Sequence, residues 1–388
     1  MLICLIVFIL VPIIGLPIYI LYYLLDKNKS GILYSILLGI MFGILAYYFN
    51  PPENYDLYRL KIIVSELVNL DFKSVLSLSK ISDLELIPMI YSYLIALTNN
   101  FNLLQFFVVS IGYSLLFYML YDYRKITKLD TLSFIAVVLF TIFGFNTLYF
   151  ISGLYNYIAI IIFSFAIYSE YIKKNKKIFS YILYALTLFI HNSMFFPFSI
   201  LIIYKLSNNK LNFKSASLVL FVFFFAYYIL NFINNYTGIS IISKLLDMYN
   251  SYVGGNSGFK NLYSGNILLI ELIKWIVTIL CILLETNRKK FSDVNGFILL
   301  LSLGTLLMIP RSRVMIRFVM LIQFVGIVPM IDLLKNSNKN KVLNFMIIIG
   351  FGFMFLIYTF FVLKGENFGY LSSNIFGNIF SVFKRSMI

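Results

Sequence analysis

Long apolar runs recur along the whole chain. A run of about 18 or more apolar residues can cross a hydrocarbon layer about 30 Å thick as a helix. The pattern predicts twelve spanning helices, at residues 3–25, 31–49, 101–121, 131–149, 154–172, 178–190, 193–206, 216–235, 266–284, 294–309, 314–334 and 342–363. The two segments on either side of residue 191 are short enough to form a re-entrant pair instead. The apolar segment 86–98 is too short to span alone, so it either extends the third helix or lies in the interface.

The loops between these runs fall into two alternating classes. Six short loops carry 18 of the 31 lysines and arginines, and the positive-inside rule places such loops in the cytoplasm. Both termini and the two long loops, 50–86 and 236–265, are then extracytoplasmic. The first run lacks a basic leading segment and a small-residue cleavage site, so we interpret it as a retained span. The sequence predicts an all-α polytopic membrane protein with a single integral membrane domain, residues 1–388.

Both long loops contain an amphipathic helical pattern. The apolar positions at helical spacing in the first loop are Leu57, Leu60, Val64 and Leu67. Residues 239–252 repeat the pattern, and we expect both helices to lie on the outer leaflet. The glycine-rich run 254–258 that follows suits a lid, with an ordinary surface loop as the alternative.

Composition excludes several function classes. The chain is 61% hydrophobic and 12% charged, which no soluble core requires. Its net charge of +15 would suggest nucleic acid in a soluble domain, but the cytoplasmic loops explain it here. Cys4 and Cys281 lie in predicted spans near opposite faces, so we expect no disulfide. The sequence contains no nucleotide-binding, CxxC, HExxH or DxD motif, and we expect neither a cofactor nor a metal.

Three arginines interrupt two apolar runs near the carboxyl end. Arg311, Arg313 and Arg317 fall on the extracytoplasmic side of the predicted topology, against the usual charge bias. A guanidinium group matches phosphate oxygens bidentately, so we interpret the cluster as a diphosphate-binding site at the outer interface. The alternative is that these side chains reach to lipid headgroups.

Two further residues are candidate general bases. His191 is the only histidine, and it ends the predicted span 178–190 at the same depth as the arginines. It could accept a proton or only orient a ligand, or it could be an ordinary interfacial histidine. Asp56, with Arg59 close behind it, could bind a sugar hydroxyl or act as the base; the alternative is that it caps the amphipathic helix.

Charged and aromatic residues within the spans complete the candidates. Glu271 and Lys274 lie three residues apart inside span 266–284, where they can pair on one helical face. Intramembrane charges are functional candidates, although a neutralised pair has the same pattern. Tyr155 at another outer turn could stack on a sugar, but tyrosine is common at membrane interfaces.

Short motifs in this order resemble the EpsG/Wzy-like polysaccharide polymerases. They are Asp56-Leu57-Tyr58-Arg59, Gly153-Leu154-Tyr155-Asn156-Tyr157-Ile158-Ala159, Ile190-His191-Asn192-Ser193 and the late arginine segment. The resemblance covers most of the chain. Many relatives have an arginine where this chain has Tyr155, so any role of that arginine falls here on another residue, with Arg311, Arg313 and Arg317 as the candidates.

The resemblance implies a metal-independent glycosyltransferase with a GT-C-like helical bundle in the bacterial cytoplasmic membrane. Such a polymerase of O-antigen, the glycan of lipopolysaccharide, or of capsule transfers a glycan from undecaprenyl diphosphate to the nonreducing end of another lipid-linked repeat unit. Its expected partners are those repeat units, membrane lipids, a chain-length regulator and a flippase. The rival interpretation is a twelve-span flippase of lipid-linked oligosaccharides or another transporter, which predicts two similar halves and charges along a central path.

Overall fold

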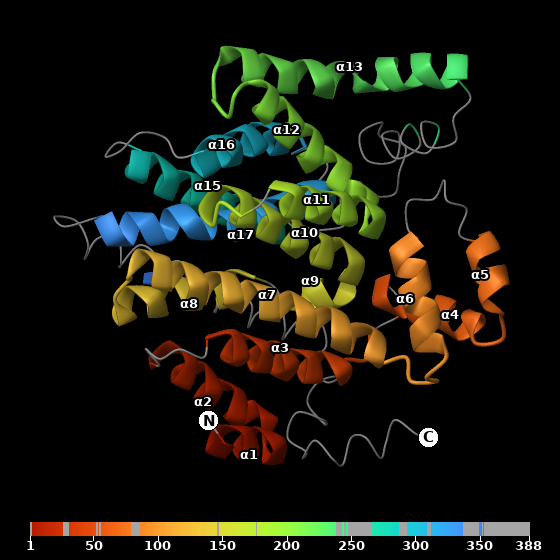
Figure 1. Ribbon diagram of the computed structural model, residues 1–388, viewed down its shortest axis with the longest axis vertical. Helices are drawn as coiled ribbons and strands as arrows, with labels where there is room; N and C mark the ends of the chain where they lie inside the picture. Colours follow the sequence, from red (N-terminus) through yellow and green to blue (C-terminus); the bar gives the residue numbers. More distant parts are fainter. Residues whose placement is uncertain are drawn as a thin grey trace. The chain divides into compact units, whose positions relative to one another are not determined.

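The computed structural model describes residues 2–25, 31–51, 53, 56–78, 86–145, 147–175, 177–237, 243, 246, 265–286, 293–308, 312–336, 349–350 and 352. Within these ranges every regular element is a helix (Figure 1), as the sequence predicts. Three helical segments are long and apolar enough to cross a membrane: Leu103–Thr127, Leu154–Ile172 and Met315–Lys335. The predicted span 342–363, the second amphipathic helix and the glycine-rich run lie almost entirely outside the described residues.

The chain divides into two compact units, which are described separately. The first unit comprises Met1–Leu78, Ile87–Phe165 and Leu334–Ile388, and the second comprises Ser79–Leu86 and Ala166–Leu333. Helices of the first unit are α1 (Leu2–Leu10), α2 (Pro12–Leu25), α3 (Gly31–Tyr47), α4 (Asp56–Leu67), α5 (Phe72–Leu78), α6 (Leu86–Ala96), α7 (Leu103–Thr127), α8 (Thr131–Gly144), α9 (Thr147–Ser152) and α10 (Leu154–Ile167).

The predicted span 3–25 is two helices, so this prediction was wrong. The chain breaks at Val11, immediately before Pro12, because the residue that precedes a proline is driven out of the helical conformation. Pro12 then starts α2, where its missing N–H costs nothing. A Cβ at Gly15 would overlap the backbone of Phe8, so α1 and α2 pack too closely for a larger residue. Hydropathy alone does not detect such a break.

Two other predicted segments also end differently. The predicted span 131–149 stops at Gly144, and a separate short helix, α9, follows. The apolar segment 86–98 forms α6, which is separated from α7 by a turn and does not extend it. In contrast, the predicted span 101–121 is a helix that continues to Thr127, so Arg124 lies inside it.

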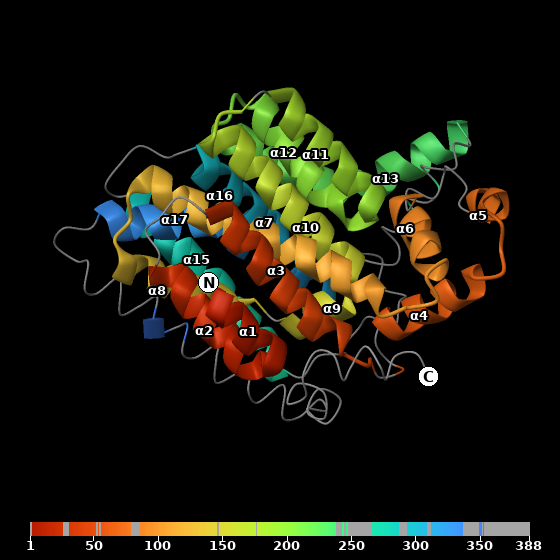
Figure 2. The same ribbon diagram turned by 60° about the horizontal axis from the view of Figure 1, so that its bottom comes forward.

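Helices α3 and α7 form the closest pair in the first unit, side by side in Figures 1 and 2. Gly39 and Gly43 of α3 face Ser110 and Ser114 of α7, and a Cβ on either glycine would overlap α7. Ser114 Oγ donates to the Ser110 carbonyl within α7 at 2.7 Å. Small residues at such a contact let helix backbones approach closely, which favours association within lipid.

Helix α4 confirms the amphipathic pattern predicted for the first long loop. Leu57, Val64 and Leu67 are buried, while Ile62 and Ile63 on the other side are exposed. The apolar stripe therefore packs against the protein itself, where we had expected it to face lipid. Lys61, which lies outside this stripe, donates a hydrogen bond from Nζ to Asn102 Oδ1 at 2.6 Å.

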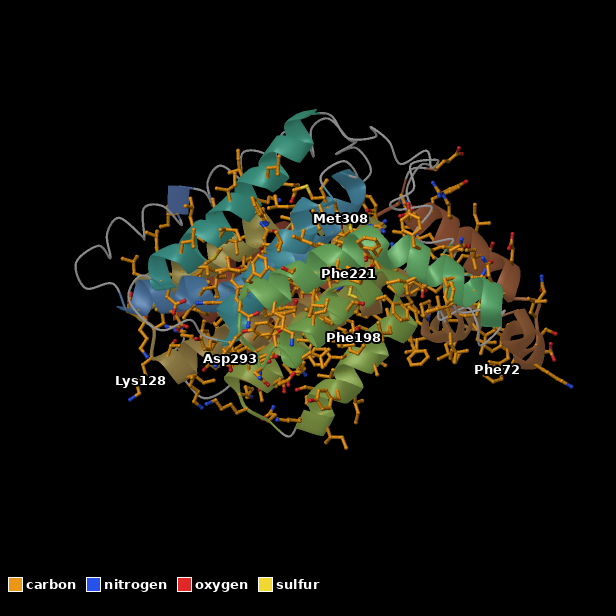
Figure 3. All side chains as sticks on the ribbon, turned by 90° about the horizontal axis from the view of Figure 1, so that it is seen from above. Phe72, Lys128, Phe198, Phe221, Asp293 and Met308 are labelled. Atoms are coloured by element: carbon orange, nitrogen blue, oxygen red, sulfur yellow. The ribbon has the colours of Figure 1, made fainter. Side chains whose placement is uncertain are left out.

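The second unit contains the π-helical turn η2 (Tyr168–Ile172), α11 (Lys177–Ile190), the 3₁₀ turn η3 (Asn192–Met194), α12 (Phe195–Leu206), α13 (Phe213–Thr237), α15 (Gly265–Thr286), α16 (Asp293–Leu306) and α17 (Ser312–Asn336). Helices α12, α13 and α16 pack against one another, and α11 and α12 form a hairpin whose tip is η3. In Figure 3 Asp293 and Met308 mark opposite ends of the α16 region.

Candidate functional site

The structure divides the predicted site residues between the two units. His191, Glu271, Lys274 and Arg317 belong to the second unit, whereas Asp56, Arg59 and Tyr155 belong to the first. Arg311 lies outside the described residues, and Arg313 is in the first turn of α17 without a described side chain.

His191 occupies the tip of the α11–α12 hairpin. Its backbone is extended, with φ −155° and ψ 126°, and its side chain caps η3. The Ser193 backbone N–H donates to His191 Nδ1 at 3.1 Å, and Ser193 Oγ lies 2.8 Å from the same nitrogen. A backbone N–H can only donate, so Nδ1 must present its lone pair. The neutral ring then carries its proton on Nε2.

Arg317 acts electrostatically on this histidine. Burial, and then the Arg317 guanidinium, lower the pKa of His191 from 6.5 to about 3. Both side chains are half-buried, so each keeps some surface accessible. The structure thus brings together the lone histidine and one arginine of the late cluster, and it holds the imidazole neutral near pH 7.

A packed apolar cluster supports Arg317 from neighbouring helices. Met315, Phe318 and Val319 of α17 are buried together with Met308, and Trp275 of α15 packs against them. Phe196, which follows η3 at the start of α12, lies with its ring centroid 4.5 Å from that of Phe318. Because Phe318 is adjacent to Arg317 and Phe196 is close to His191 in the chain, this contact fixes both polar residues to one framework.

Glu271 and Lys274 form the ion pair that their spacing predicts. Lys274 Nζ lies 2.8 Å from Glu271 Oε1, and the two side chains are 1% and 0% exposed. Glu271 Oε2 and Trp275 Nε1 have no hydrogen-bond partner among the residues that the structure describes. The pair lies within one turn of Trp275, which packs against the apolar cluster around Phe318, and it still has hydrogen-bonding capacity open.

Asp56 and Arg59 also form a pair, but at the surface. Asp56 is the first residue of α4, where a carboxylate interacts favourably with the helix dipole. Its Oδ1 lies 3.8 Å from Arg59 Nη1, and their side chains are 57% and 68% exposed. The predicted helix-terminal role fits this position. Both side chains are therefore exposed among the residues that the structure describes.

Tyr155 has a packing role within the first unit. Its hydroxyl lies 2.8 Å from Ser92 Oγ and donates to the Pro88 carbonyl at 3.4 Å. Its ring meets Tyr91 edge-on, with the centroids 6.4 Å apart. These contacts attach α6 to α10.

One polar cluster in the second unit was not predicted. Glu170, in the π-helical turn η2, accepts hydrogen bonds from Tyr184 and Lys205, each at 2.9 Å. Lys205 also lies over the Tyr181 ring, 4.3 Å from its centroid. The available signal was an acidic residue inside the predicted span 154–172, since intramembrane charges require partners. Its partners come from α11 and α12, and no sequence pattern connects the three segments.

The helices and their apolar composition define a multi-pass α-helical membrane protein. The sequence profile of the EpsG family matches residues 71–372, so the chain belongs to the EpsG family. Membership indicates a glycosyltransferase-like polymerase involved in polysaccharide synthesis. No curated protein and no solved structure matches the chain.

Proposed function

We propose that the protein polymerises O-antigen or capsular repeat units at the outer face of the bacterial cytoplasmic membrane. A glycan on undecaprenyl diphosphate is the donor, and the nonreducing-end hydroxyl of a second lipid-linked unit is the acceptor. The observation that carries the proposal is the packing of Phe196 against Phe318, which holds the segments of His191 and Arg317 together in a chain of the EpsG family. Both residues can hydrogen-bond to a charged ligand.

The chemistry needs positive charge more than it needs a metal. In a direct displacement, the acceptor oxygen forms a bond to the anomeric carbon while the bond from that carbon to the diphosphate oxygen breaks. The electron pair leaves with the diphosphate, and the acceptor proton passes to a base. Arg317, with Arg311 and Arg313, would bind the diphosphate and stabilise the charge that develops on it. Attack from the opposite face would invert the anomeric centre.

The proposed topology follows from the distribution of charge. In the proposed topology the lysine-rich loops lie in the cytoplasm and both termini outside, so α4 and the start of α17 would be on the extracytoplasmic side. We propose that the chain acts as one integral membrane domain, that a GT-C-like bundle admits polyprenyl tails between helices, and that the long loops cover the sugars. A chain-length regulator and a flippase would then act with it.

The base for the acceptor hydroxyl is His191 or Asp56 in this proposal. Asp56 is exposed, so an acceptor hydroxyl could reach its carboxylate, but Arg59 is paired with it. Glu271 and Lys274 would contribute by fixing α15, whose Leu272 and Trp275 pack against the apolar cluster around Phe318. Tyr155 and Arg59 remain candidates for sugar contacts.

Glycan laddering in a strain that lacks this gene tests the proposal. Wild-type protein should restore a ladder, while Arg317→Ala at matched membrane levels should leave mostly single repeat units on the surface. Lys125→Ala is the matched control, because this cation is exposed, belongs to the other unit and has no role in the proposal. If the strain without the gene displays no glycan outside at all, the protein is a flippase. If Arg317→Ala gives a normal ladder, the arginine is a lipid anchor.

A further inference from the structure

We infer that His191 binds the diphosphate as a hydrogen-bond donor through Nε2–H, next to Arg317, and that it is not the base. The inference rests on the proposed function, since it takes the anion to be the donor's diphosphate. It concerns a positioning residue: His191 would hold the leaving group, and the acceptor proton would go elsewhere.

The two ring nitrogens of His191 have different hydrogen-bonding roles, and neither leaves a lone pair free for a base. A general base needs a free lone pair directed at the acceptor hydroxyl. The only lone pair of neutral His191 is on Nδ1, and the Ser193 backbone N–H occupies it at 3.1 Å. To use Nδ1 as a base, the side chain would have to abandon the cap of η3. The remaining nitrogen, Nε2, carries a proton and can only donate.

The positive charge that His191 would gain as a base is also unfavourable at this position. A base becomes positively charged when it takes a proton. An imidazolium at this position would be repelled by the Arg317 guanidinium, because the Phe196–Phe318 contact holds the two segments together in a half-buried site. A neutral N–H donor next to the guanidinium has no such penalty. The two groups together favour an anion, which a neutral sugar hydroxyl does not provide.

The helix that follows His191 points its amino terminus towards this residue, which also favours an anion. Residues 192–206 form a continuous helical segment, η3 and then α12, and His191 is at its amino end. The partial positive charge of a helix amino terminus stabilises anions within its first turn. Histidine, guanidinium and helix terminus therefore all favour a negatively charged ligand.

Two isosteric substitutions separate donor, cap and base. In H191N the side-chain oxygen can still accept from the Ser193 N–H, but no group reaches the position of Nε2. In H191Q the amide nitrogen can occupy the position of Nε2 and donate, while the cap is lost. Neither amide can act as a base. Each role therefore gives a different pattern in the two variants.

The test measures binding of farnesyl diphosphate to the purified full-length protein in lipid nanodiscs, with farnesol as the uncharged control. We expect H191N to weaken diphosphate binding about tenfold, H191Q to stay within about threefold of wild type, and neither to alter farnesol binding. The ladder assay should follow the same order. Size-exclusion profiles and thermal unfolding identify any variant that fails to fold.

Two outcomes would overturn the inference. If H191N binds and polymerises normally while H191Q does not, the histidine is only a helix cap. If both variants bind the diphosphate normally and both lose the ladder, the histidine is the base. A wild-type protein that gives no ladder would refute the proposed polymerase activity instead, and the binding comparison would still decide the role of His191.

Discussion

Two ion pairs in this protein have the same sequence spacing and opposite environments. Asp56 and Arg59 lie three residues apart on α4, with their charged atoms 3.8 Å apart and both side chains more than half exposed. Glu271 and Lys274 have the same separation on α15, but they are 2.8 Å apart and completely buried. Spacing alone predicts both pairs, so the difference arises from tertiary packing. Because Glu271 and Lys274 are buried, the fold depends more on their pairing than on that of Asp56 and Arg59.

The physical contrast is one of desolvation. Both charges of an exposed pair keep most of their hydration in the folded protein. Double-mutant cycles assign such pairs a contribution of roughly 0–1 kcal/mol to stability. A buried pair loses the hydration of both charges, so each partner depends on the other. The open Oε2 of Glu271 shows that even this pair leaves hydrogen-bonding capacity unused among the described residues.

The largest predicted effect comes from breaking the buried pair on one side. Lys274→Met should lower the free energy of unfolding by about 3–5 kcal/mol, because Glu271 is left as an uncompensated buried charge. Thermal unfolding in detergent can be followed by the emission of Trp275, the only tryptophan and a neighbour of the pair. The double variant Glu271→Gln/Lys274→Met is the control and should recover most of the loss. Equal destabilisation by single and double variants would disprove the coupling.

Lys61, a half-buried cation that donates to an amide oxygen, should show an intermediate effect. Burial lowers the pKa of Lys61 on α4 from 10.5 to about 8. The unfolded chain therefore binds more protons than the folded chain between about pH 8 and 10.5, and the stability of α4 should rise with pH across that window. Hydrogen exchange of the α4 amides, corrected for intrinsic rates, measures this, and Lys61→Met should abolish the slope. A slope of the opposite sign would mean that Asn102 stabilises the ammonium more than burial destabilises it.

The smallest predicted effect belongs to the exposed pair. Asp56→Ala and Arg59→Ala should each change the free energy of unfolding by no more than about 1 kcal/mol, and added salt should reduce even that. The same unfolding assay, at low and high salt, checks this expectation. A loss of several kcal/mol would mean that α4 has partners beyond the contacts described here, and that the comparison with Glu271 and Lys274 fails.

Patterns that depend on one element were readable from the sequence. The stripe of Leu57, Val64 and Leu67 and the pairing of Glu271 with Lys274 both follow from helical periodicity, and the structure confirms them. The break at Val11 was missed because the apolar run continues across it, although Pro12 was a local signal that hydropathy does not weigh.

Patterns that join distant segments were not readable. The predicted span 101–121 leaves Arg124 in the lysine-rich loop that follows. In the structure Arg124 is buried and donates to the Leu24 carbonyl at 3.2 Å and to Thr131 Oγ1 at 3.1 Å. Side-chain geometry within a short motif was not readable either. The family motif draws attention to His191 and Ser193, but it does not show which ring nitrogen of His191 Ser193 contacts. That detail requires coordinates, and it decides between an acceptor and a donor.

The glycine contact between α3 and α7 also sets an order of events during synthesis. Tyr47, at the end of α3, is made about 80 residues before Thr127 completes α7, which at about 5–20 residues per second is a delay of about 4–16 s. Throughout that interval, the face of α3 that carries Gly39 and Gly43 lacks the helix it fits most closely. The amino-terminal third of the protein thus reaches its native pairing only after the ribosome has passed residue 127.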